Sequence, residues 1–168
     1  MNLDKIEIID YLPEHKNYFK QLNYVWINKY FTVEKEDLKL LENPEENIIK
    51  TGGAILIAKR GDEIVGTCGL LKINEDTFEL VKMAVDEKER GKNIGYMLGY
   101  AAVNKAKILG AKNIQLETSS TLMPAVNLYK KLGFIEVPLK DSEYKRCNLK
   151  MVLDLKHFSF SYTKDEPS

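Results

Sequence analysis

The chain has 168 residues, of which 44% are hydrophobic and 30% are charged, so its composition is that of a folded domain and not of a disordered segment. Its 25 basic residues equal its 25 acidic residues, and this balance argues against a general nucleic-acid-binding protein. The apolar run at residues 54–58 is far too short to span a bilayer, and the N-terminal segment lacks the apolar region of a signal peptide. Cys68 and Cys147 show no metal-ligand spacing. We therefore expect one cytoplasmic domain over residues 1–157, without a metal or a membrane partner, followed by a flexible tail over residues 158–168.

The N-terminal third predicts a strand followed by two helices. Residues 5–11 alternate as a strand does, and a second helix, expected over residues 34–42, ends at Pro44. Between them, residues 14–30 carry apolar side chains at three- and four-residue steps, which predicts an amphipathic helix. The predicted buried face of that helix consists of Tyr18, Leu22, Val25, Trp26 and Tyr30.

The middle of the chain changes to a period of two and predicts a three-stranded meander. Residues 54–73 are typical of two strands joined by a tight turn at residues 60–62, and residues 77–85 supply the third strand. A long helix begins near Ile94, and Gly110 is suited to its C-terminal cap.

The last third predicts one more strand and helix before a final pair of strands. Residues 113–118 form the strand, and residues 119–121 are expected to cap the helix that Gly133 ends. The final strands are expected at residues 134–137 and 147–155. The order β-αα-βββ-α-β-α-ββ predicts an α/β fold, an α+β arrangement of a mixed sheet flanked by helices. The strands on either side of the long helix should be parallel neighbours, because such crossovers are right-handed.

The sequence RGKNIG, which begins at Arg90, places small residues between a strand and a helix. The first N–H groups of a helix lack partners and carry a partial positive charge, so such a turn can bind phosphate. Gly91 and Gly95 lack a Cβ atom that would hold a ligand away from the backbone, and Asn93 tolerates the left-handed region. Arg90 and Lys92 can add ion pairs. The spacing matches neither common phosphate loop, so a plain strand-to-helix connection stays open on these residues alone.

Three segments together carry a resemblance to a known family. RGKNIG resembles the acyl-CoA pyrophosphate loop, [RQ]-x-x-G-x-[GA], of the GNAT N-acetyltransferase superfamily, and ELVKMAV before it is similar to the family's fourth strand. AVNLYKKLGF, residues 125–134, resembles the family's A-x-x-L-Y-x-x-x-G-F signature, although Asn93 and Leu122 stand where the family often has Gly and Asn. The resemblance implies a GNAT-like fold over residues 5–155. It also implies an N-acetyltransferase that transfers an acetyl group from acetyl-CoA by direct attack of a primary amine, carried by a small or amino-acid-like acceptor.

The same resemblance implies the residues of the site. Tyr129 would contact the cofactor and act as general acid toward the departing thiolate, and Glu79 would be the base. Strict alternation would place Glu79 on one face with Val81, Met83 and Val85. The cofactor would be held by Met83, Ala84, Val85, Arg90, Gly91, Lys92, Asn93, Ile94 and Gly95. The acceptor would be held by Trp26, Tyr30, Phe31, Glu34 and Arg146, with Tyr144 nearby.

Each of these assignments has a purely structural alternative. Tyr129 can be a core aromatic residue, Glu79 an exposed or lysine-paired carboxylate, and Arg146 a solvated loop charge, while the aromatic residues of the first helix can belong to the core. At the level of function, three alternatives stay open: a non-catalytic acyl-CoA sensor, an enzyme that acetylates a protein N-terminus or lysine, and a nucleotide-phosphate binder. Arg146 would suit an acceptor carboxylate, and a homodimer also stays open.

Overall fold

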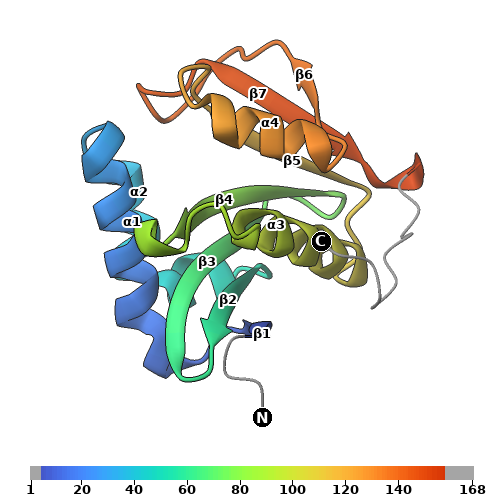
Figure 1. Cartoon of the computed structure of the whole chain (residues 1–168). Helices are drawn as coiled ribbons and strands as arrows, with labels where there is room; N and C mark the ends of the chain where they lie inside the picture. The colour runs from blue at the N-terminus through green and yellow to red at the C-terminus, as the bar shows by residue number, and fades with distance from the viewer. Residues whose placement is uncertain (1–4, 158–168) are drawn as a thin grey trace.

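A mixed sheet of seven strands, in the order β1-β2-β3-β4-β5-β7-β6, runs through the computed structural model, which describes residues 5–157 (Figure 1). The strands are β1 (Ile6–Asp10), β2 (Ala54–Arg60), β3 (Glu63–Lys72), β4 (Thr77–Val85), β5 (Asn113–Thr118), β6 (Ile135–Val137) and β7 (Leu149–Asp154). The expected mixed α/β class is therefore confirmed. The tail predicted over residues 158–168 lies outside the described residues.

Helices cover both faces of the sheet and enclose two separate cores. The helices are α1 (Lys16–Tyr30), α2 (Lys35–Glu42), α3 (Ile94–Ile108) and α4 (Met123–Lys131), with short turns η1 (Pro13–His15), η2 (Glu45–Ile49), η3 (Glu87–Glu89) and η4 (Leu155–His157). One core lies between the sheet and α3 and α4, and the other lies under α1, α2 and η2. Fully buried side chains such as Leu98 in the first core and Phe19 in the second each stabilise the fold by about 1.5–3 kcal/mol.

The buried face of α1 differs from the predicted one. Phe19, Asn23 and Ile27, spaced by four residues, are buried, and the Asn23 amide donates to the Phe19 carbonyl at 2.9 Å. Three members of the predicted stripe are exposed: Tyr18 (49%), Val25 (57%) and Tyr30 (39%). Two rows of side chains, each with apolar members, lie next to each other on this helix, and the spacing of residues alone could not decide which row the sheet covers. The aromatic stripe is therefore left at the rim of the core.

A β-bulge interrupts β4 at Lys82. Thr67 of β3 pairs with Ala84 and Gly69 pairs with Val81, so β4 holds one more residue than β3 over this stretch. Lys82 has φ 54, in the left-handed region that non-glycine residues rarely adopt. A bulge bends its strand and changes which face the following side chains occupy.

This bulge makes the predicted common face of β4 wrong. Val81 packs against the core under α1 and α2, whereas Met83 and Val85 pack against the core under α3 and α4. The inserted residue reverses the alternation between Val81 and Met83, which strict period-two reasoning could not anticipate. Glu79 therefore shares the α1 side with Val81, and the side chains of Met83 and Val85 lie across the sheet.

β4 and β5 are parallel neighbours, as predicted, but they pair over a short stretch. The register ends at Glu79 opposite Gln115, while β4 continues to Val85 and β5 to Thr118. Figure 1 shows the two strands diverging beyond that point. The edge of β4 that faces β5 therefore has backbone N–H and C=O groups without ladder partners. Such an edge can accept an extended ligand as a further strand.

The ends of α4 confirm one prediction and correct another. Gly133, at φ +105, follows the helix as expected, and the Phe134 N–H donates to the Tyr129 carbonyl at 3.0 Å. The N-cap, however, is Leu122, which makes no side-chain capping bond. The expected capping by residues 119–121 fails because the Ser119 and Thr121 hydroxyls bond each other at 2.7 Å.

Candidate active site

The start of α3 forms an open cradle of backbone donors. Asn93 has φ 67 and adopts the left-handed conformation that the sequence indicated, and Gly91, with φ 78, adopts it as well. Asn93 is the N-cap of α3, yet its side chain makes no capping bond. The Met97 N–H donates to the Asn93 carbonyl at 3.1 Å, which leaves the N–H groups of residues 94–96 without a partner inside the helix.

The cradle has room for a ligand at its backbone. A Cβ atom on Gly91 would meet no heavy atom within 4 Å, so the space beside this residue is open. Glycine is favoured here because of the positive φ and not because of a close contact. Gly95 faces α4 instead, because its Cβ would lie 3.3 Å from Leu128 Cδ2. The uncapped N–H groups, the left-handed turn and the open side fit an anionic group such as a diphosphate.

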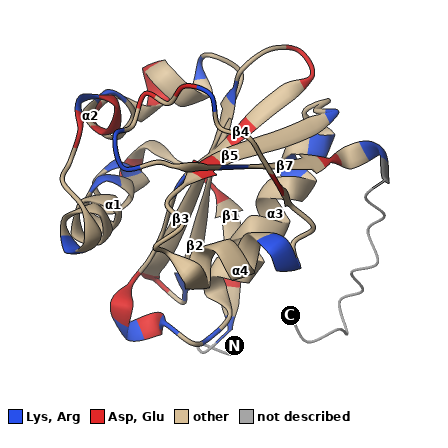
Figure 2. Cartoon of the chain, turned by 90° about the horizontal axis from the view of Figure 1, so that it is seen from above, with Lys and Arg blue, Asp and Glu red and all other residues tan. Residues whose placement is uncertain are grey.

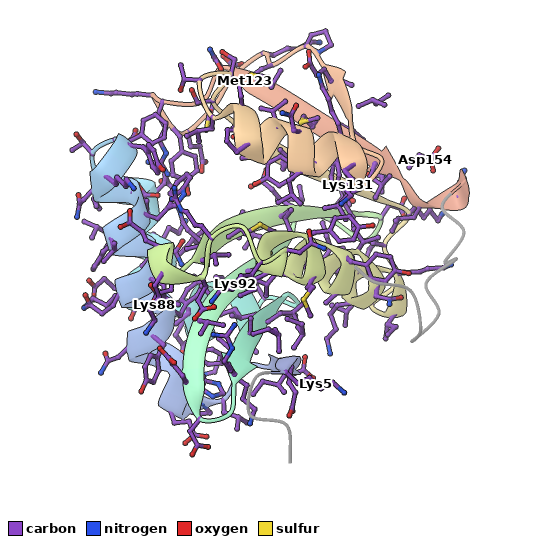
Figure 3. The ribbon with its side chains drawn as sticks, viewed as in Figure 1. Lys5, Lys88, Lys92, Met123, Lys131 and Asp154 are labelled. Carbon is purple, nitrogen blue, oxygen red and sulfur yellow. The ribbon has the colours of Figure 1, made fainter. Side chains whose placement is uncertain are left out.

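The charges around this cradle leave one arginine without a carboxylate. Glu89 is buried and pairs with Arg60 at 2.6 Å and with Lys92 at 3.2 Å; Figure 3 shows Lys92 in the loop before α3. Arg90 instead donates to the Tyr30 hydroxyl at 2.7 Å and lies over that ring. Among the described residues, no carboxylate lies within ion-pair distance of Arg90, so its charge is available to an anion.

Beyond the cradle, the gap between β4 and β5 contains a small cavity of about 90 Å³. The cavity is lined by parts of several segments, among them Trp26, Glu79, Met83, Glu117, Tyr129 and Arg146. The structure thus brings together the predicted acid, the predicted base and part of the predicted acceptor wall.

Glu79 stands in this cavity in a form that suits a base. Burial raises the pKa of its carboxyl above the ordinary 4.5, and the neighbouring Glu117 and Glu143 raise it further. The Gln115 amide donates to Glu79 Oε1 at 2.9 Å and fixes its orientation. Among the described residues, Glu79 has no lysine or arginine within ion-pair distance, which removes the lysine-paired alternative.

Tyr129 reaches the same cavity from α4. Its ring lies edge-on to Phe134 with 6.1 Å between centroids, so the side chain also packs as a core aromatic residue. Burial raises the pKa of the phenol well above 10.0, and the hydroxyl therefore keeps its proton at neutral pH. The catalytic and structural interpretations of this residue are compatible, because the ring packs against Phe134 and the residue also lines the cavity.

A buried ionic cluster that the sequence did not reveal closes the cavity beside α2. Asp37 is completely buried and accepts from Arg146 Nη1 at 2.8 Å and Nη2 at 2.6 Å, and also from Lys82. Burial alone would raise the pKa of Asp37, but the Arg146 hydrogen bonds and the Lys82 charge outweigh it and lower the pKa to about 2. Arg146 reaches Glu34 as well, at 3.2 Å. Its guanidinium is therefore already occupied, which argues against a role in binding an acceptor carboxylate.

Aromatic rings hold these cations in place. Lys82 and Arg146 lie over the Tyr144 ring, with their charged atoms 4.7 and 4.6 Å from its centroid. Arg146 also lies 5.7 Å from the Phe31 centroid, and Phe31 is 6.2 Å from Trp26. Phe31 and Trp26 thus form an aromatic wall, as predicted.

Two predicted acceptor residues take other positions. Tyr30 lies beside the cradle through its bond to Arg90, and Glu34 bonds Arg146 and the Lys145 N–H, the latter at 2.9 Å. Neither lines the cavity. Two of the predicted cofactor residues lie outside the lining of this cavity. Val85 lines a second pocket together with Arg90, and Ala84 is buried in the sheet.

Glu117 is the second carboxylate of the cavity, and sequence analysis missed it. Its Oε1 atom is buried and has no hydrogen-bond partner among the described residues. It lies on β5 two residues after Gln115, directly opposite Lys150 of β7. In the sequence, Gln115 and Glu117 alternate with the apolar Ile114 and Leu116, which indicates a strand with one polar face. This pattern alone does not predict that the polar face lines a cavity.

Comparison with known proteins settles the family. Residues 20–134 match the sequence model of the Acetyltransferase (GNAT) family. The chain belongs to the Acetyltransferase (GNAT) family. An uncharacterized N-acetyltransferase of Bacillus subtilis, YvbK, is 38% identical over 101 residues, which are 58% of this chain and 65% of that protein. The chain therefore spans somewhat less than two thirds of this relative.

Solved structures share the GNAT fold more fully. An acetyltransferase of the GNAT family from Staphylococcus aureus superposes with a TM-score of 0.81 at 26% identity, covering 90% of this chain and 99% of that one. An acetyltransferase of Bacillus subtilis, solved in complex with CoA, superposes with a TM-score of 0.70 at 24% identity and the same coverage.

Surface charge and hydropathy complete the description of this GNAT domain. Figure 2 shows basic and acidic segments interspersed over the described chain. Among residues 5–157, no helix has the length and apolar character needed to cross a membrane.

Proposed function

We propose that this chain catalyses acetyl transfer from acetyl-CoA to a primary amine of a small-molecule acceptor. Acetyl-CoA is the cofactor of the GNAT family. The observation that carries the proposal is the cavity between β4 and β5, which Glu79 and Tyr129 both line, next to an uncapped helix N-terminus. If the segment between β4 and α3 were only a structural connection, it would need neither the unpartnered N–H groups at the start of α3 nor the titratable side chains of Glu79 and Tyr129 in one cavity.

The residues present suit the cofactor's two ends. The N–H groups of residues 94–96 and the Arg90 guanidinium would hold its diphosphate, because both are free of carboxylates. The open edge of β4 at Met83, Ala84 and Val85 would hydrogen-bond its extended arm as a further strand. Bound there, the cofactor would supply the thioester that the acceptor amine attacks.

The chain's own groups then divide the work of the reaction. Glu79 takes a proton from the acceptor's ammonium group, directly or through a water molecule, and its raised pKa brings this transfer closer to neutral pH. A backbone N–H of the β4 edge stabilises the negative charge that develops on the carbonyl oxygen, a contribution of about 3 kcal/mol for one donor. Tyr129 donates a hydrogen bond to the departing sulfur. Because the raised pKa makes the phenol a weaker acid than a thiol, its proton passes to the sulfur only as the second proton of the attacking nitrogen replaces it on the phenol oxygen.

A small acceptor is favoured over a protein chain by the closure beside α2. The bonds from Arg146 to Asp37 and Glu34, together with the Lys145 N–H to Glu34, tie the loop before β7 to the α1–α2 connection. A polypeptide would need this passage open, whereas a small amine fits a cavity of about 90 Å³.

The test combines turnover with binding. Purified protein is mixed with acetyl-CoA and a panel of small amines, and free thiol release is followed while CoA binding is measured by calorimetry. We expect thiol release that depends on the amine, and we expect ATP to compete poorly with CoA. Tight CoA binding without turnover on any amine would instead establish a sensor, and equal competition by ATP would support a nucleotide-phosphate binder.

A further inference from the structure

The loop that forms the cradle contains one buried side chain, and that side chain is a carboxylate. Between Ala84 and Ile94, Glu89 is the only buried residue, and its side chain is 4% exposed. In the same loop, Gly91 and Asn93 adopt the left-handed conformation. A non-glycine residue keeps this conformation where surrounding contacts hold it, and a glycine leaves the chain free to adopt others. The contacts of Glu89 therefore bear directly on how well the cradle keeps its shape.

Glu89 connects the loop to the sheet through Arg60. Arg60 Nη1 lies 2.6 Å from Glu89 Oε1, and Arg60 is the last residue of β2. The backbone of Arg60 pairs with Glu63 of β3 on one side and with Ile6 of β1 on the other, so its side chain projects from a fixed part of the sheet. The second oxygen, Glu89 Oε2, lies 3.2 Å from Lys92 Nζ of the loop itself. One carboxylate thus binds a paired strand with one oxygen and the turn before α3 with the other.

Neither charge nor stability explains a buried carboxylate at this place. A negative charge near an anion site repels the ligand, so Glu89 opposes diphosphate binding by its own charge. Its two cationic partners, Arg60 and Lys92, compensate that charge. A buried ion pair is also often no more stabilising than apolar side chains of similar volume. What the pair does provide is geometry, because it fixes the loop against the sheet.

We propose that Glu89 is a positioning residue for the cofactor, which holds the turn at Gly91 and Asn93 so that the N–H groups of residues 94–96 meet the diphosphate without rearrangement. This inference rests on the proposed binding of acetyl-CoA at the cradle. Holding a loop in its bound shape removes an ordering cost from binding and so raises affinity. The chemistry takes place in the cavity between β4 and β5, so Glu89 affects cofactor affinity and leaves the reaction step unchanged.

The substitution Glu89→Gln separates positioning from simple electrostatics by the sign of its effect. It removes a negative charge near the diphosphate, so charge alone predicts tighter CoA binding. Loss of two charge-assisted bonds to the loop predicts the opposite. We expect the CoA dissociation constant, measured by calorimetry, to rise about tenfold or more. We expect KM for acetyl-CoA to rise in parallel, while kcat at saturating acetyl-CoA keeps its wild-type value.

Two further variants complete the test. Glu87→Gln is the matched control, because Glu87 lies in the same η3 turn, is half exposed and pairs with Lys29 of α1. It removes the same charge and leaves the Glu89 contacts in place, so CoA should bind as tightly as in the wild-type protein or slightly more tightly. The double variant Arg60→Gln/Glu89→Gln keeps the net charge of the chain and removes the ion pair. It should bind CoA as weakly as Glu89→Gln does, and it carries the test if the single variant does not fold.

The outcomes separate this inference from the function on which it rests. Wild-type or tighter CoA binding in the folded Glu89 variants would refute the positioning role and leave the proposed acetyltransferase intact. A fall in kcat as large as the fall in affinity would also refute it, because the effect would then reach the reaction step. Failure of the wild-type protein to bind CoA would overturn the proposed function and the role of Glu89 together.

Discussion

Replacing Asp37 by asparagine removes the anion that holds two buried cations, and it tests directly what closes the cavity. The new amide could still accept one hydrogen bond, but it could not compensate Lys82 and Arg146, whose side chains are only 5% and 12% exposed. The perturbation keeps the shape of the side chain and changes its charge. Any loss of stability therefore reports the ion pairs more than the packing.

The size of the effect has a lower and an upper bound. The pKa of Asp37 is about 2 in the folded chain against an ordinary 3.8, so ionised Asp37 stabilises the fold by about 2 kcal/mol at neutral pH. Because the folded pKa is the lower one, this contribution is present above about pH 4 and is lost as the pH falls toward about 2. The substitution also leaves two cations unpaired, and breaking a buried pair in this way costs about 3–5 kcal/mol.

The assay is urea denaturation at neutral pH, with a thermal melt beside it. We expect Asp37→Asn to lower the free energy of unfolding by about 3–5 kcal/mol, or Tm by about 6–20 °C for a chain of this size. Asp76→Asn, which breaks an exposed pair with Lys112 at 3.6 Å, is the matched control and should cost less than about 1 kcal/mol. A loss below about 1 kcal/mol in Asp37→Asn would show that the cluster is solvated and that our interpretation of the closed cavity is mistaken.

Three further substitutions address the site itself. Gly95→Glu should abolish CoA binding in calorimetry, because it places a negative charge in the first turn of α3, and it should also lower the melting temperature because the new side chain meets Leu128 of α4; retained CoA binding would contradict the cradle. Tyr129→Phe should lower kcat about tenfold or more with the CoA dissociation constant unchanged, and an unaltered kcat would remove its role as acid. Glu79→Gln should lower kcat while the free energy of unfolding at neutral pH stays equal or rises. The sign follows because burial raises the folded pKa of Glu79, so its ionised form opposes folding, and the difference between the variants should shrink near about pH 4.

Local pattern was enough to predict much of this protein. The period of two through residues 54–73 and the small residues around Asn93 depend on near neighbours, and the structure confirms both strands and the left-handed turn. The order of elements then limited the sheet topology, because crossover handedness leaves few arrangements. The resemblance at residues 90–95 and 125–134 led to the family for the same reason, since both motifs are contiguous.

Tertiary structure alone decided which polar side chains meet. Asp37 and Arg146 are far apart in the chain, and nothing around either residue in the sequence indicates a buried pair. The bulge at Lys82 reverses the alternation of side chains along β4. The Lys82 ammonium group then bonds Asp37, a contact that depends on β3 and α2 as much as on β4. Burial and charge balance are properties of the assembled fold, because each depends on every group packed around a site. A local sequence signal can therefore predict the phosphate cradle, but not the buried pair of Asp37 and Arg146.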